Sequence, residues 1–198
     1  MDRITFVLAT VLSLPFTPLA AQDFQKGLAA AQAGDFATTL QEWTPLAEAG
    51  SARTQNALGY MYENGYGVPQ DYAEAVRLYR LAADQGDANA QYNLGNMYAN
   101  GQGVPQDYAE AVRLYRLAAD QGDANAQYNL GFMYENGQGV LQDNVMAHMW
   151  YNIGAANGNE LGGEQRDSIA EGMTQQAIEQ AQQMARDCMG SGYQNCGY

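Results

Sequence analysis

Cysteine, histidine and basic residues are scarce in this sequence. It contains two cysteines, one histidine and nine lysines and arginines, against 22 aspartates and glutamates, so its formal net charge is −13. A surface this acidic repels phosphate backbones, which argues against nucleic acid as a partner. No basic amphipathic segment is present to bind anionic lipid. The acidity instead fits a soluble exported protein and favours a basic partner.

Long apolar runs are also missing, apart from one at the start of the chain. Residues 4–20 (ITFVLATVLSLPFTPLA) follow Arg3 and are interrupted by Pro15 and Pro18. The run is too short and too interrupted to span a membrane, and small residues follow it. We predict a signal peptide over residues 1–21, cleaved after Ala21, and export to the periplasm or secretion from a bacterium. The mature chain is expected to make no stable membrane insertion.

No motif for catalysis or for metal binding stands out. His148 has no positioned partner in any catalytic motif, so we interpret it as a packed structural histidine. The repeated pairs Asp84/Asp87 and Asp120/Asp123 lack the dense oxygen spacing of a calcium loop and are interpreted as helix caps. The serines lie outside nucleophile motifs. We therefore expect neither enzymatic activity nor a cofactor.

Both cysteines lie near the C-terminus. An exported chain meets an oxidising compartment, so we predict a disulfide between Cys188 and Cys196. Closing so short a loop contributes roughly 2–3 kcal/mol in the chain-entropy description. Two helices are expected in this tail, one over residues 160–172 and one from an N-cap at Thr174 to Met189. They would cover the open end of the preceding structure.

An internal repeat dominates the rest of the chain. Residues 54–89 and 90–125 repeat with a period of 36 residues and differ at only six positions. Such a period is typical of a solenoid, in which each unit buries its apolar face against its neighbours. Residues 126–159 continue the pattern, residues 22–53 form a variant first repeat with a shorter turn, and residues 160–198 form a helical cap.

Each repeat is expected to be a pair of antiparallel helices. In the second repeat, helix A covers residues 90–100, and Gly95 lets another helix approach closely. Gly101 ends this helix, because glycine accepts the left-handed conformation that follows a helix C-terminus. Asp107 and Glu110 predict a capping box at the start of helix B.

The pattern AxxxLGxMYxNGxGVxQDxxxAxxxYxxAAxxGxxxA resembles the Sel-one-like repeat, a relative of the tetratricopeptide repeat. The ending AHMWYNIGAANGN, with the Cys-x7-Cys tail, is also similar to bacterial exported members. The resemblance implies an all-α fold, a right-handed α-solenoid of antiparallel helix pairs used for protein–protein interaction. We expect a monomer that binds a protein or peptide.

The few differences between the repeats fall mainly on one stripe of helix A, at spacings i, i+4 and i+7. In tetratricopeptide-like solenoids the corresponding face lines the concave groove, where amides bind backbone and aromatics act as anchors. The alternative is neutral drift on a solvent face after duplication. We predict that the partner-binding groove carries Asn56, Tyr60, Glu63, Tyr92, Asn96, Tyr128, Phe132 and Glu135.

These observations favour a non-catalytic scaffold or adaptor that binds its partner in the concave groove. One alternative is a cell-wall-related ligand-binding protein or hydrolase of the β-lactamase-like type, because cysteine-rich members of the resembling group are associated with β-lactam binding. Their repeats carry a cysteine pair that these repeats lack. The other alternative is a structural component of an envelope or secretion complex.

Overall fold

The computed structural model describes residues 19–194, 196 and 197, so most of the predicted signal peptide lies outside the described residues. Within this part, ten helices and no strand are present. The helices are α1 (Leu19–Gln32), α2 (Phe36–Glu48), α3 (Ala52–Asn64), α4 (Tyr72–Ala83), α5 (Ala88–Asn100), α6 (Tyr108–Ala119), α7 (Ala124–Asn136), α8 (Asn144–Ala156), α9 (Glu160–Ala170) and α10 (Gln175–Gly190). None of these described helices is long and apolar enough to cross a membrane.

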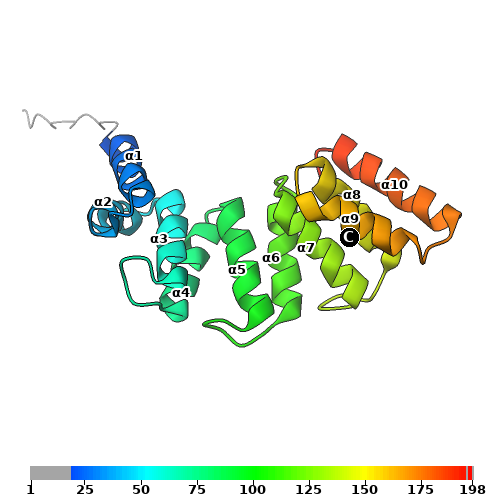
Figure 1. Ribbon diagram of the computed structural model, residues 1–198, viewed down its shortest axis with the longest axis horizontal. Coiled ribbons are helices and arrows are strands. Elements are labelled where there is room, and N and C mark those ends of the chain that lie inside the picture. The colour runs from blue at the N-terminus through cyan, green and yellow to red at the C-terminus, as the bar shows by residue number, and fades with distance from the viewer. Residues whose placement is uncertain (1–18, 195, 198) are drawn as a thin grey trace, which may run out of the picture.

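Figure 1 shows the helix pairs following one another in a row from α1–α2 to α7–α8, with α9 and α10 at the C-terminal end. Each pair packs on the next, and α10 lies against α8. The all-α solenoid predicted from the repeats is therefore confirmed. Its core is a series of apolar layers between pairs rather than one central cluster.

Aspartate begins most of the helices. Asp87 and Asp123 accept hydrogen bonds from the backbone of Ala90 and Ala126, so their interpretation as caps is confirmed. Asp107 caps α6 in the same way. The reciprocal half of the predicted capping box is wrong, because Glu110 binds Arg113 at 2.8 Å.

The reason for this difference lies in the backbone of Asp107. Its N–H group donates to the carbonyl of Tyr98 at 3.0 Å and is therefore already satisfied. Glu110 has no donor to reach for at the N-cap and turns toward the guanidinium of Arg113 instead, forming an exposed ion pair.

In each helix pair, a glycine of the first helix lies against an aromatic ring of the second helix. A Cβ atom added to Gly95 would lie 2.7 Å from the ring of Tyr115, which is closer than real side chains pack. The close approach expected at Gly95 is thus present. The same contact recurs in the other pairs as Gly27–Trp43, Gly59–Tyr79 and Gly131–Tyr151.

The glycines after helix A have two different roles. Gly101 is the left-handed C-cap of α5, with φ of 67°, as the sequence predicts. Gly103 also has a positive φ of 70°, but a Cβ atom there would overlap the carbonyl of Tyr72 at the start of α4. This second glycine therefore lets one repeat pack directly on the backbone of the preceding one.

Buried glutamines link successive repeats. The side-chain amide of Gln91 donates to the carbonyl of Ala83, 3.3 Å away, and its oxygen accepts from Gln121 at 2.8 Å. Gln55 and Gln127 have equivalent bonds. Since a buried amide without partners is costly, this network fixes how each helix pair stacks on the next.

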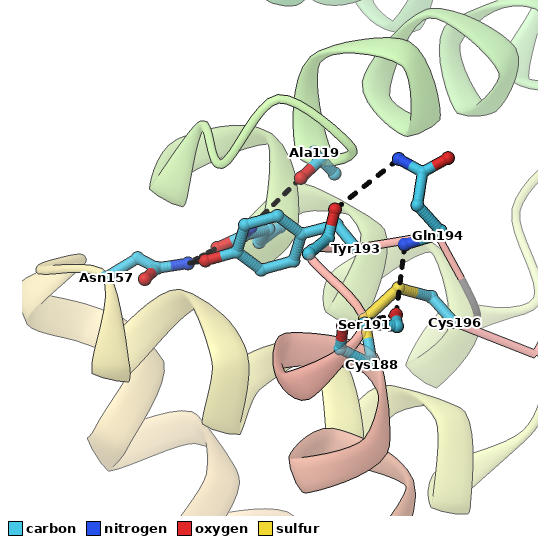
Figure 2. The surroundings of a disulfide bond; sticks show 9 residues. Ala119, Asn157, Cys188, Ser191, Tyr193, Gln194 and Cys196 are labelled. Carbon is cyan, nitrogen blue, oxygen red and sulfur yellow. Dashed lines mark hydrogen bonds between the residues drawn. A yellow bond between two sulfur atoms is a disulfide. The ribbon is translucent and has the colours of Figure 1, made fainter.

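The C-terminal tail completes this network. Cys188 and Cys196, which the sequence predicts to pair, form a disulfide that ties the C-terminal end of α10 to the tail (Figure 2). The bond holds the following turn so that the Tyr193 hydroxyl accepts a 2.8 Å hydrogen bond from Asn157. Asn157 also donates to Gln127, at 2.8 Å. The tail therefore closes the glutamine network at the open end of the last repeat.

Candidate partner-binding groove

A cavity of about 610 Å³ opens where the first helix pair meets α3 and α5. Its wall includes three of the eight predicted groove residues, Asn56, Tyr60 and Tyr92. The remaining wall comes from α1, α2, α3 and the turn after it, and the starts of α5 and α7. These further wall residues are Ala31, Gln32, Phe36, Trp43, Ala57, Met61, Tyr66, Asn89, Asn93, Asp123 and Asn125.

Aromatic rings form the exposed side of this cavity. Tyr60 is 51% exposed and Tyr66 is 40% exposed, although both are large and largely apolar. Their ring centroids are 5.9 Å apart, and Tyr66 in turn stacks on Phe36 at 5.3 Å. The contacts among the three rings restrict their positions.

Amide side chains line the cavity beside these rings. The amide of Asn93 donates to the side-chain oxygen of Asn56, 3.0 Å away, which orients the two groups. Asn89 and Asn125 also line the wall. Asparagine offers both donors and acceptors and can thus match the alternating N–H and C=O groups of an extended peptide.

Three other predicted residues accept hydrogen bonds from buried tyrosines. Glu63 and Glu135 accept hydrogen bonds from the hydroxyls of Tyr79 and Tyr151, at 2.5 and 2.6 Å. Asn96 accepts one from Tyr115 at 2.7 Å. Burial raises the pKa of all three phenols, so they stay protonated and act as donors.

On this stripe, the residue at one position therefore depends on the residue three positions away. Position 99 is alanine and offers no acceptor, so the neighbouring Asn96 takes that role for Tyr115. Where Glu63 supplies the acceptor, the residue equivalent to Asn96 is Tyr60. Some of the differences between the repeats therefore preserve a hydrogen bond to a buried tyrosine. This explanation is separate from both groove specificity and neutral drift.

The last two predicted residues lie further along the stripe. Tyr128 packs on Tyr151, with ring centroids 5.4 Å apart, whereas Phe132 is 43% exposed. Sequence reasoning missed Phe36 and Tyr66 as parts of the site. Position 66 is one of the six that differ between the twin repeats, so a signal was available there.

Helix pairs stacked at a 36-residue period define an α-solenoid repeat protein. The Sel1 repeat profile matches residues 52–87, 88–123 and 124–159, and the chain belongs to the Sel1 repeat family. No curated protein sequence matches the chain. Proteins with the Sel1 repeat fold are typically protein-interaction scaffolds and are generally not enzymes.

Two solved structures are similar over most of the chain. One is a protective antigen present in uropathogenic Escherichia coli strains that displays an SLR fold, with 32% identity and a TM-score of 0.74 over 89% of this chain. The chain spans 44% of that protein's length. The other is a Sel1 repeat protein from Oxalobacter formigenes, with 26% identity and a TM-score of 0.72 over 85% of this chain and 74% of its own.

Proposed function

We propose that this protein is a non-catalytic adaptor that binds an extended segment of a partner protein across α3, α5 and α7. The observation that carries the proposal is the exposed aromatic pair Tyr60 and Tyr66, which stands over a cavity of about 610 Å³. An apolar side chain of the partner would enter this cavity. The flanking segment would continue along the stripe toward Phe132.

Physical chemistry supports this use of the site. Binding sites combine a mainly apolar concave surface with a few placed polar groups, and large rigid aromatics supply most of the energy. The cavity offers that combination through Tyr60, Tyr92 and the Asn56–Asn93 amide pair. The partner's apolar side chain would supply most of the affinity, and hydrogen bonds from its backbone to the amides would fix its position along the groove.

The charge of the chain adds a preference for basic partners. The formal net charge is −13, and Asp123 is part of the cavity wall. An acidic surface speeds encounter with a basic segment, and added salt reduces this effect. Binding is therefore expected to weaken as ionic strength rises, mainly through slower association.

The experiment compares capture of the native partner by two matched variants. Tyr60→Ala, Tyr92→Ala, Phe132→Ala removes the groove aromatics, whereas Leu81→Ala, Leu117→Ala removes two side chains of 40% exposure on α4 and α6. We expect the first variant to stay folded and lose the partner, and the second to keep it. Partner capture by the first variant at full level would refute the groove.

We further propose that the chain acts outside the cytoplasm, as an exported periplasmic or secreted bacterial protein. The apolar run in residues 4–20 and the Cys188–Cys196 disulfide support this location. Intact-mass analysis of the envelope and secreted fractions should show a chain beginning near Gln22. A full-length chain confined to the cytosol would contradict export and would leave the groove proposal standing.

A further inference from the structure

A second cavity, of about 450 Å³, lies among α8, α9 and α10 in the C-terminal cap. It shares no lining residue with the groove cavity. Its polar lining comes from His148 and Asn152 of α8, Arg166 and Asp167 of α9, and Gln182 and Arg186 of α10. Nothing in the proposed groove binding uses these groups.

Positive charge gathers here in a chain that is otherwise strongly acidic. Two guanidinium groups and one carboxylate line the cavity, while the whole chain has nine lysines and arginines and a formal net charge of −13. Arg166 is held in place, because it donates to Asp167 at 2.8 Å and to Asn152 at 3.1 Å. Arg186, on α10, is exposed and lines the same cavity.

His148 forms the buried part of the cavity wall. Its side chain is 2% exposed and lines the cavity, and Nδ1 is buried with no hydrogen-bond partner among the described residues. Buried polar atoms are almost always paired, since leaving one unpaired is costly. The rest of the ring lines the cavity, so a bound group with hydrogen-bonding oxygens would lie against His148.

We propose that the cap cavity is a binding site for a carboxylate group, with Arg186 and Arg166 as its cationic partners and His148 as a hydrogen-bonding partner at its inner wall. Guanidinium groups present several N–H donors in a plane that matches the two oxygens of a carboxylate. The hydrogen bonds of Arg166 and Arg186 within the protein leave some of these donors unused.

The charges favour a monoanion over phosphate. Arg166, Arg186 and Asp167 together give a local charge of about +1 at neutral pH. Burial and the nearby Arg166 lower the pKa of His148, so the imidazole stays neutral and adds no further charge. Asp167 would repel a second negative charge, which a phosphate brings.

The test uses the ring C–H signals of His148, which are easily assigned because it is the only histidine in the chain. Sodium acetate is titrated into the full protein at constant ionic strength, with inorganic phosphate as the second probe. We expect a saturable shift with acetate and a weaker or unsaturated response with phosphate. A linear or absent shift with acetate, or tighter binding of phosphate, would overturn the proposal.

Variants separate this site from general charge effects. Arg186→Gln should weaken acetate binding at least about tenfold, because it removes a charge-assisted pair from the ligand. Arg77→Gln, a change of the same charge on α4, should leave the binding unchanged. Equal affinity in Arg186→Gln and the wild type would refute the site, and thermal unfolding verifies that both variants remain folded.

The carboxylate could belong to a peptide C-terminus or to a small free acid, and a further titration distinguishes the two. N-acetyl-alanyl-alanine and its amide are titrated in the same way as acetate. Tighter binding of the free acid than of acetate assigns the site to a chain terminus, and equal binding assigns it to a small free acid. Binding of the amide as tightly as the free acid would show that the carboxylate is not what the cavity recognises, and the proposal would fail.

Discussion

The hydroxyl of Tyr115 donates a 2.7 Å hydrogen bond to the side-chain oxygen of Asn96. The equivalent tyrosines of the neighbouring repeats, Tyr79 and Tyr151, donate to Glu63 and Glu135 instead. The repeats therefore keep a buried phenol satisfied with two different acceptors on the same helix face. The contribution of this acceptor to the free energy of unfolding can therefore be measured by exchanging residues between repeats.

Asn96→Ala should destabilise the protein by about 1–3 kcal/mol, because the buried hydroxyl of Tyr115 loses its acceptor. Adding Ala99→Glu should recover most of this loss, since it recreates the arrangement at Glu63. Chemical denaturation of the single and double variants measures both effects.

The control for this pair is Tyr115→Phe. In that background Asn96→Ala should cost less, because no hydroxyl remains to be satisfied and only the hydrogen bond that Asn96 accepts from Asn129 is lost. An equal cost of Asn96→Ala with and without the hydroxyl would mean that Asn96 stabilises the repeat through other contacts.

Glycines 86 and 103 provide a second test. Both have positive φ, but added side-chain atoms at Gly86 meet nothing within 4 Å, whereas at Gly103 they overlap the Tyr72 carbonyl. Gly86→Ala should cost about 1–2 kcal/mol from backbone strain alone. Gly103→Ala should cost clearly more, because it also separates two repeats. Similar melting temperatures for the two variants would contradict the close packing at Gly103.

The buried histidine predicts a pH dependence of stability. Burial lowers the pKa of His148 below its ordinary value of 6.5 in the folded chain. Between the lowered and the ordinary pKa, the unfolded chain binds more protons, so the free energy of unfolding falls as the pH drops below about 6.5. His148→Gln should reduce this fall between pH 7.5 and 5.5, as measured by urea denaturation. An unchanged pH dependence in the variant would show that His148 is not the group responsible.

The disulfide is expected to stabilise the cap and not the repeats. Cys188→Ser with Cys196→Ser should lower stability by roughly 2–3 kcal/mol and loosen α10, while the helices of the repeats persist. Circular dichroism and hydrogen exchange of α10 amides measure the two parts. Titration of free thiols on the native protein is the control, because free thiols there would refute the pairing itself.

The fold was largely predictable because the same helix caps, glycines and packing residues recur in three repeats. Helix ends, the close approach at Gly95 and the tail helices all depend on nearby residues or on one recurring spacing. The capping box failed because the backbone N–H of Asp107 is used by Tyr98, a partner the local pattern does not include.

The candidate site was only partly predictable for a similar reason. Phe36 comes from the divergent first repeat, where the register is hard to align, yet it stacks on Tyr66 of the next unit. Glu63 and Glu135 sit on the predicted face, but their tyrosine partners depend on how helix B packs against helix A. Long-range packing, and not helix periodicity, decides which side chains remain available to a partner.

The most direct test of the groove replaces single residues of the full chain by a photo-crosslinking amino acid in its native host. Phe132 and Leu117 are 43% and 40% exposed, so the two positions differ in location and hardly in accessibility. We predict crosslinks to one partner from Phe132 and from Tyr60, and none from Leu117. Crosslinks from Leu117 with none from Phe132 and Tyr60 would contradict the account and place binding on the opposite helices.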